Sequence, residues 1–223
     1  MNTKSININK TKDNLKNKLS SLLLILNNDK LAFISAVFLF FILIVAIFGP
    51  TFVQEPATKM NLRMRNLEPF SLDNGWLFYF GADSLGRSMI ARLIIACQNT
   101  IFIAGTAVFI SMILGGTLGL ISGYFGGRLG NLIMRIADII MSFPSLLLAV
   151  VVLYIFEPGI KNLIIVLAFT RLPVYMRTAR AEVLEIRERL FVSAAITMGA
   201  TNVRIIFKHI APLVYPTLLT IAT

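Results

Sequence analysis

One stretch of the sequence constrains the fold more than any other. Residues 31–48 form a run of 18 residues without a charged side chain, and almost all of them are apolar. A run of this length is what a helix needs to cross the hydrocarbon core of a bilayer. The whole chain, 223 residues, is 57% hydrophobic and only 14% charged. Since a helix satisfies its own backbone groups in lipid, the sequence predicts an all-α, polytopic transmembrane helical bundle.

Further apolar runs predict further spans. The expected spans are residues 31–48, 100–121, 132–156 and 160–176, with a fifth beginning near Ile210. From Ala211 the chain has 13 residues left, about 20 Å of helix, whereas the hydrocarbon core is about 30 Å thick. The sequence is therefore expected to end inside its fifth span.

The basic residues predict an orientation. The formal net charge of +10 would suggest a nucleic-acid partner in a soluble chain, but fifteen of the 21 Lys and Arg residues fall in segments on one side of the predicted spans and six on the other. Lys and Arg are enriched in cytoplasmic loops, which places the N-terminus and the loop after the fourth span in the cytoplasm. Topology accounts for the basic excess, so no nucleic-acid partner is expected.

The spans divide the chain into four parts. Residues 1–30 are a cytoplasmic segment in which leucines recur on one helical face, which predicts a helix lying on the inner membrane surface. The first span, 31–48, is followed by an external segment, 49–99. Residues 100–223 form a transmembrane core with a charged cytoplasmic loop at about 177–209.

That charged loop has a helical pattern of its own. Apolar residues recur with a helical period and Gly199 then interrupts them, the apolar positions being Val183, Leu184, Leu190, Phe191, Ala194, Ala195 and Met198. The pattern predicts a short amphipathic helix, a glycine turn and a second helix. An ordinary amphipathic loop between two spans is the simpler alternative.

The same loop resembles a known motif. Residues 191–200, FVSAAITMGA, and the residues Ile205, Ile206, His209, Ile210 and Pro212 are similar to the cytoplasmic EAA loop of ABC-importer permeases. The resemblance implies a coupling helix that sits in a cleft of an ATP-hydrolysing subunit. It would be carried by Ser193, Ala194, Ala195, Met198, Gly199 and Ala200. Ser193 stands where the family motif has a glutamate.

A second stretch carries the same resemblance. Asp83, Gly86, Arg87 and Arg92 match, in type and spacing, the segment before the second span in permeases of dipeptide, oligopeptide and nickel importers. Ser88 stands where the family has a second aspartate. An N-cap aspartate and a turn glycine would explain the residue types, but not their joint spacing.

Small residues and one proline mark the transmembrane core. Gly115, Gly119 and Gly123 are four residues apart and predict a stripe that lets a neighbouring helix approach closely, in this chain or in a partner permease. Pro144 lies inside the third predicted span, where it should kink the helix, free a carbonyl and help to line the translocation path. Arg135 and Asp138, at i and i+3, are predicted to pair.

The chain shows no chemistry of its own. It has one Cys and one His, too few for a metal site or a nucleophile with its base. It has no Gly-x-x-x-x-Gly-Lys-Ser/Thr loop for phosphates. We expect no catalytic residue, no metal and no bound cofactor. ATP would be hydrolysed by partner subunits.

The resemblance implies a type I importer permease in the bacterial cytoplasmic (inner) membrane. Its partners would be a second homologous permease, two ATP-binding cassette ATPases and an extracytoplasmic solute-binding protein, and it would carry peptides or nickel. A truncated, non-transporting remnant or an assembly scaffold is the alternative of another class. A membrane-embedded enzyme would need polar residues that converge within the spans, and the sequence offers none.

Overall fold

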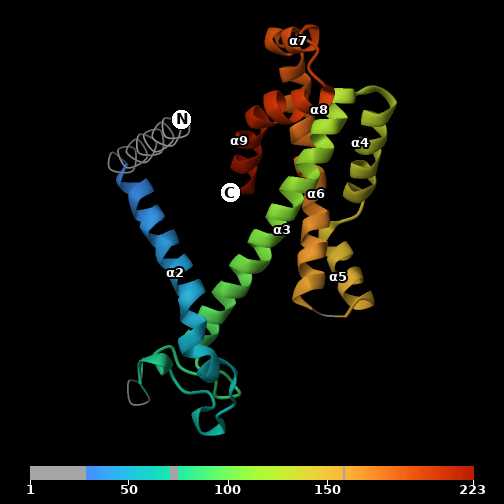
Figure 1. The fold of residues 1–223 in the computed structure, drawn as a ribbon. Helices are drawn as coiled ribbons and strands as arrows, with labels where there is room; N and C mark the ends of the chain where they lie inside the picture. The colour runs from blue at the N-terminus through green and yellow to red at the C-terminus, as the bar shows by residue number, and fades with distance from the viewer. Residues whose placement is uncertain (1–28, 71–74, 158) are drawn as a thin grey trace, which may run out of the picture. The chain divides into compact units, whose positions relative to one another are not determined.

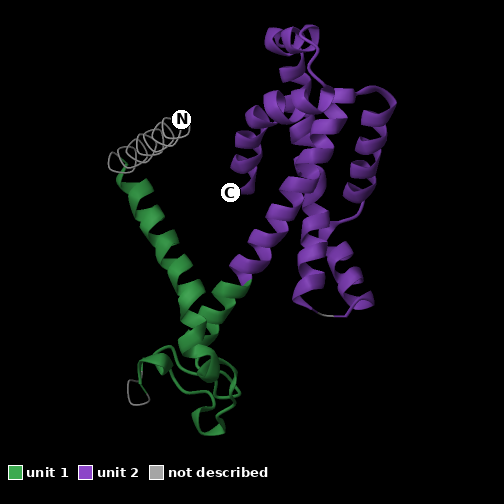
Figure 2. Cartoon of the chain, viewed as in Figure 1, with its two compact units in different colours: residues 1–99 green, residues 100–223 purple. Residues whose placement is uncertain are grey.

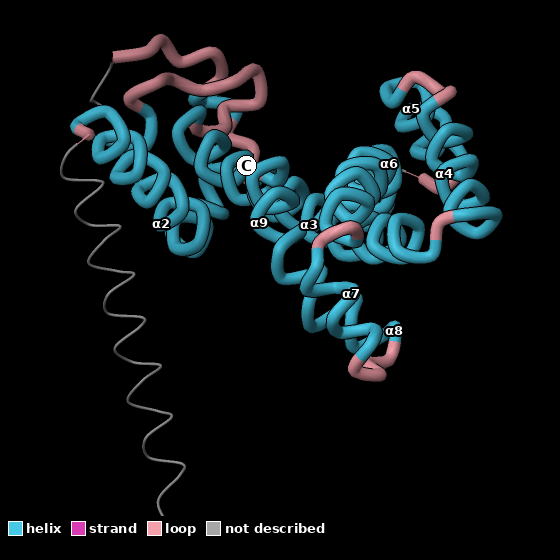
Figure 3. Tube along the Cα trace, turned by 90° about the horizontal axis from the view of Figure 1, so that it is seen from above, coloured by secondary structure: helices cyan, strands magenta, loops and turns pink. Residues whose placement is uncertain are grey.

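The protein was analysed as a computed structural model, which describes residues 29–70, 75–157 and 159–223 (Figure 1). The chain forms two compact units, residues 1–99 and 100–223 (Figure 2). Helices make up most of the described residues, which contain no strand and only an isolated bridge between Ala82 and Ser88 (Figure 3). The prediction of an all-α fold is confirmed. The predicted surface helix within residues 1–30 lies outside the described residues.

Unit 1 begins with the long helix α2 (Lys30–Thr58). The side chain of Asp29 caps it by accepting its first backbone N–H groups. The sequence predicted that the span ends at residue 48, before Gly49 and Pro50, but α2 continues through the proline to Thr58. Pro50 has no N–H to donate, and the Thr51 hydroxyl donates to the Phe48 carbonyl 2.5 Å away. The carbonyl that loses its helical donor is that of Ala46, four residues before Pro50, and helices of membrane proteins tolerate such a proline.

The segment of unit 1 between α2 and the next helix, predicted from the sequence to be external, is mostly irregular. It contains two single turns of 3₁₀-helix, η1 (Leu62–Met64) and η2 (Trp76–Phe78). Val53, Ala57 and Ala91 are buried together beneath it, so the end of α2 and the start of the next helix share a small core.

In unit 2, helices that follow one another in the chain are connected by short turns. Helix α3 (Met89–Phe125) begins in unit 1 and continues into unit 2, followed by α4 (Gly127–Met141), α5 (Ser145–Ile155) and α6 (Ile160–Arg187). The predicted kink at Pro144 is a complete break, because α4 and α5 meet there at 81°. Proline disfavours helical backbone at the residue before it, so α4 ends before Pro144 and a new helix starts after it.

The C-terminal part consists of α7 (Leu190–Thr197), α8 (Asn202–Arg204), the π-helical turn η3 (Ile205–Ile210) and α9 (Ala211–Ala222). The last three form one helix of 21 residues from Asn202 to Ala222. Counted from Ala211, as we expected from the sequence, this helix would be too short to cross the membrane. In the structure the helix begins nine residues earlier, at Asn202. At 1.5 Å per residue its length is about 31 Å.

Three helices in the described residues are long and apolar enough to cross a membrane, namely α2, α3 and the helix from Asn202 to Ala222; the bent pair α4–α5 would make a fourth. Helix α6, which contains the predicted span 160–176, is not among them. Lys161, Arg171 and Arg177 interrupt its apolar run.

Helices α3 and α6 touch through the glycine stripe. A Cβ atom on Gly119 would lie 2.5 Å from the Cβ of Ala179 and 2.6 Å from the carbonyl oxygen of Met176. Gly115 and Gly123 meet α6 in the same way, one turn to either side. Backbone therefore packs directly on the neighbouring helix, as in small-residue contacts of membrane proteins.

Hydrogen bonds join the same helices. The buried hydroxyl of Ser111 donates to the carbonyl of Ala168 on α6 over 2.8 Å. The hydroxyl of Ser122 and a guanidinium nitrogen of Arg180 both donate to the carbonyl of Gly130 on α4, over 3.1 Å and 3.0 Å. Three helices are thus tied together by polar contacts at fixed positions.

The glycine contact predicts opposite effects for the same substitution at two places in α3. Gly119→Ala should destabilise the protein by about 1–3 kcal/mol, because the added methyl group overpacks a backbone contact. Gly105→Ala should stabilise it by about 0.5–1 kcal/mol, because a Cβ there would meet nothing within 4 Å. Unfolding in detergent, followed by circular dichroism, measures both. Equal effects of the two substitutions would contradict the close α3–α6 contact.

Candidate functional site

Helix α7 is held by one narrow face. Val192 is fully buried and Ala195 is 4% exposed. Being three residues apart, they lie on the same side of the helix. They pack in a cluster with residues of α6 and η3 that include Val183, Ile205 and Ile210. Helix α7 is thus attached to α6 and η3 through Val192 and Ala195, one pair of residues at i and i+3.

The rest of α7 is exposed and largely apolar. Leu190 is 87% exposed, and Met198, just after the helix, is 82% exposed. The predicted motif residues Ser193 and Ala194 are exposed beside them. The exposed apolar surface of this segment consists of Leu190, Phe191, Ile196 and Met198. An apolar patch of this kind marks a surface that another molecule covers.

The Met-Gly-Ala part of the motif ends α7. Gly199 has a φ of +79°, its N–H donates to the Ile196 carbonyl at 2.9 Å, and the N–H of Ala200 donates to the Ala195 carbonyl at 3.0 Å. This pair of bonds is the Schellman motif, which needs a left-handed residue where Gly199 stands. Ala200 also packs against the cluster that holds Ala195. The glycine turn predicted from the sequence is thus a helix stop of defined geometry.

The predicted amphipathic helix is divided in two. Its first part, with Val183 and Leu184, belongs to α6, and α7 starts only at Leu190. The chain turns at Glu188 and Arg189 between them. The turn lets Val183 on α6 and the buried face of α7 enter the same cluster.

Asp138 has a different partner from the one predicted. Its carboxylate lies 2.6 Å from the guanidinium of Arg177 on α6, and among the described residues it makes no ion pair with Arg135. Both side chains of the pair are about half exposed. The pair adds a charged contact between α4 and α6, where the sequence suggested one within α4.

Pro144 lies beside a hollow in unit 2. The hollow has a volume of about 320 Å³ and lies where α4 and α5 separate. Its lining residues are Ile140, Met141, Phe143, Pro144, Ser145 and Thr170. Ser145 at the break and Thr170 on α6 thus bring two hydroxyl side chains to the hollow.

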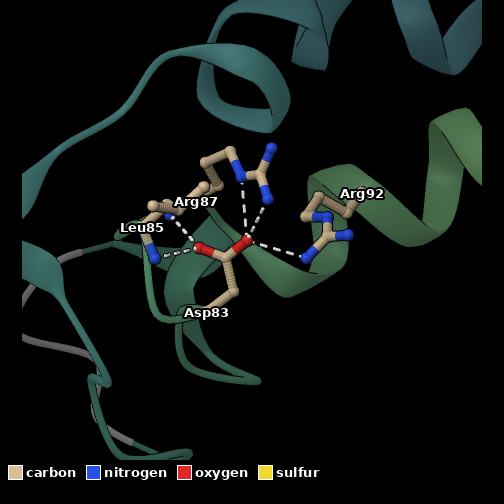
Figure 4. A network of polar contacts seen from close by, with 4 residues as sticks. All are labelled: Asp83, Leu85, Arg87 and Arg92. Atoms are coloured by element: carbon tan, nitrogen blue, oxygen red, sulfur yellow. Dashed lines mark hydrogen bonds and ion pairs between the residues drawn. The ribbon is translucent and has the colours of Figure 1, made fainter.

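The second motif, before α3, converges on Asp83 (Figure 4). One carboxylate oxygen accepts the backbone N–H groups of Leu85 and Arg87, both at 2.9 Å. The other accepts the Nε of Arg87 at 2.8 Å and pairs with Arg92 at 2.7 Å. The Asp83 side chain is only 11% exposed. Three of the four motif residues predicted from the sequence thus meet at one carboxylate.

These donors set the acidity of Asp83. Its carboxyl pKa is lowered to about 2, above all because the backbone N–H of Arg87 donates to it, with further contributions from the Arg87 guanidinium and the N–H of Leu85. Burial acts in the opposite direction. The charged carboxylate holds the loop closed through these contacts, so we call the site a structural anchor.

The other positions of this motif shape the backbone. Gly86 has a φ of +74°, and a Cβ there would lie 1.7 Å from the Asn61 carbonyl oxygen. Ser88 is fully buried, donates to the Leu77 carbonyl and accepts the Ala91 N–H at 3.2 Å. It therefore caps α3, a task that serine and aspartate both perform. A serine directly before an apolar helical run was the signal for this cap, and our sequence analysis missed it.

The lowered pKa predicts a pH dependence. A carboxyl group with a depressed folded pKa stabilises the fold above its unfolded pKa, about 3.9, and that contribution disappears as the pH falls through about 2. We expect Asp83→Asn to lower the melting temperature at pH 7, and the difference from the wild type to shrink between pH 4 and pH 2. Glu68→Gln, at an exposed carboxylate of the same unit, is the control. If the difference in melting temperature between the wild type and Asp83→Asn stays constant with pH, the Asp83 carboxylate does not stabilise the fold as described.

The helix stop predicts which residues can replace Gly199. Gly199→Val should destabilise the segment by about 2 kcal/mol, because a β-branched residue is strained at positive φ. Gly199→Asn should cost much less, since asparagine tolerates this conformation, and a side chain there meets nothing within 4 Å. Hydrogen exchange of the α7 amides measures both. Equal exchange rates in the two variants would contradict the left-handed stop.

The sequence matches two families of known proteins. Residues 115–223 match the family described as the binding-protein-dependent transport system inner membrane component. Residues 23–69 match the N-terminal transmembrane domain of oligopeptide transport permease C.

Curated relatives are similar along most of the chain. The dipeptide transport system permease protein DppC of Alkalihalophilus pseudofirmus is 35% identical over 187 residues, 84% of this chain and 60% of the relative. The oligopeptide transport system permease protein OppC of Bacillus subtilis is 34% identical over 185 residues, 83% of this chain and 59% of the relative. The probable D,D-dipeptide transport system permease protein DdpC of Escherichia coli is 33% identical over 191 residues, 86% of this chain and 62% of the relative.

The chain spans about 60% of the length of the curated relatives it matches. Within that part, the two family matches cover both ends of the described structure, from α2 to α9. The helices are also long and apolar enough to cross a membrane several times. The chain therefore belongs to the family of binding-protein-dependent transport system inner membrane components.

Proposed function

We propose that the chain is a membrane-spanning permease subunit of an ATP-driven importer that moves peptides across the bacterial cytoplasmic membrane. The relatives support the peptide class, since their names specify dipeptides, oligopeptides and D,D-dipeptides. Nickel, the other cargo that the sequence motifs allowed, finds no support in these names. The single observation that carries the proposal is this similarity, which extends over more than four fifths of the chain.

Energy would come from partner subunits. One ATPase subunit would cover the exposed apolar surface of α7, on which Leu190 and Met198 are the most exposed residues. A second ATPase subunit would bind a second homologous permease in the same way. ATP would be bound and hydrolysed there, and this chain would hold no cofactor. The excess of Lys and Arg in the loops beside α7 and at the N-terminus supports a cytoplasmic position for both.

An external solute-binding protein would deliver the substrate. The family description, binding-protein-dependent transport, supports this partner. The Asp83 anchor gives the external segment of unit 1 a fixed shape, which a docking surface requires.

The hollow beside Pro144 is our candidate for a part of the path. Its apolar walls and the hydroxyls of Ser145 and Thr170 suit a peptide. A hydroxyl group can donate a hydrogen bond to a peptide carbonyl or accept one from a peptide N–H, whatever the side chains of the peptide are. Closure of the ATPases would shift α7 and favour one of two arrangements of the helices, which open the path to opposite sides.

Charged substitutions on α7 test the proposal. Leu190→Asp and Met198→Asp should each lower ATP-dependent uptake of a labelled dipeptide at least tenfold, since a carboxylate would be buried without a partner where the ATPase docks. The amount of chain in the membrane should not change, because both positions are more than 80% exposed. Leu190→Met and Met198→Leu, which keep the same exposed positions apolar, are the controls and should transport normally.

Two outcomes would contradict the proposal. Wild-type uptake by both aspartate variants would show that this surface contacts no ATPase. Undiminished uptake in cells that lack the whole chain would show that it is not the permease.

A further inference from the structure

Both ends of the segment that carries α7 contact the same residue of α3. Before α7, a guanidinium nitrogen of Arg187 donates to the backbone carbonyl of Tyr124 at 3.1 Å. After α7, the hydroxyl of Tyr124 donates to the Oδ1 of Asn202 at 2.9 Å. These contacts join residues 63 and 78 positions apart in the chain. One tyrosine thus holds the point where the segment leaves α6 and the point where it enters α8.

Tyr124 is well placed to act as a fixed point. It is the second-last residue of α3, so its carbonyl is one of those that a helix end leaves without an internal donor. A guanidinium is favourable there because the C-terminal end of a helix carries partial negative charge. Its ring packs against the buried cluster of unit 2. The preceding residue, Gly123, lies against Val183 of α6.

The segment between these two contacts has little other attachment. On α7 itself only Val192 and Ala195 are buried. The apolar contact is therefore small, and the polar contacts to Tyr124 add the directional restraint that a few aliphatic side chains cannot give.

We infer that Tyr124 is a positioning residue, which makes the α7 segment and the cytoplasmic-side end of α3 move as one body. The inference rests on the proposed function, in which an ATPase displaces α7. A displacement would then reach α3 directly through Tyr124, as well as along α6. Without the Tyr124 contacts, α7 could shift while α3 stayed in place.

The first test measures the connection without any transport. Spin labels are attached to Leu118→Cys on α3 and Met198→Cys after α7, in the full chain in lipid nanodiscs with Cys97→Ser, which removes the one native cysteine. We expect a narrow distance distribution that broadens when Tyr124→Phe and Arg187→Ala are combined, because together they remove both contacts. Tyr154→Phe, at an 89% exposed tyrosine of the same unit, should leave it narrow. A distribution that the Tyr124 and Arg187 substitutions do not change would overturn the inference.

The second test asks whether the connection serves transport. In the reconstituted importer, Tyr124→Phe should lower the dipeptide imported per ATP hydrolysed about fivefold, the size expected for one lost neutral hydrogen bond. ATPase binding should be retained, because the exposed surface of α7 is unchanged. Asn202→Ala should give the same loss, and the double variant should add nothing, because both substitutions remove one bond. An additive double variant, or an unchanged ratio in Tyr124→Phe, would overturn the positioning role.

The two tests separate this inference from the proposed function. If the wild-type importer hydrolyses ATP without importing a dipeptide, the proposed function fails, and the spin-label distances still decide whether Tyr124 joins α7 to α3. If transport is normal and the distances do not respond to the substitutions, only the inference about Tyr124 fails.

Discussion

The direct contact of α3 with α6 is the constraint on which unit 2 depends. In lipid, apolar side chains gain little by leaving their surroundings, so helices associate where small residues let backbones come close. Gly115, Gly119 and Gly123 provide that closeness, and the hydroxyl of Ser111 adds a hydrogen bond across the contact. Helix α6 in turn contacts α4, α5, α7 and α9. A shift between α3 and α6 would therefore displace the elements that pack on α6.

The motif residues that we propose to serve function lie where helices end. Ser88 starts α3, the Schellman motif at Gly199 ends α7, and Pro144 separates α4 from α5. Helix ends leave backbone groups unpaired and need caps, glycines or prolines at fixed positions. That need explains why the recognisable motifs of this sequence are short and rigidly spaced, while the spans between them are ordinary apolar helix.

The sequence predicted the features that have a local signal. The all-α class follows from the apolar runs, and the four-residue spacing of the glycines indicated a face for close packing. Contacts between distant residues have no such signal. Asp138 pairs with Arg177, 39 positions away, and no local pattern favours that partner over Arg135. Helix ends were also misjudged, because α2 continues through Pro50 and the last helix begins well before its apolar run.

The most direct test of the functional account is a photo-cross-linking amino acid in place of Met198, 82% exposed at the end of α7. The chain would be irradiated in native membranes and the cross-linked peptides sequenced by mass spectrometry. We expect peptides of an ATPase with a Gly-x-x-x-x-Gly-Lys-Ser/Thr phosphate-binding loop, and fewer of them when Leu190 is changed to Asp. Cross-links to lipid alone, with or without ATP, would contradict the assignment of α7 as the coupling surface.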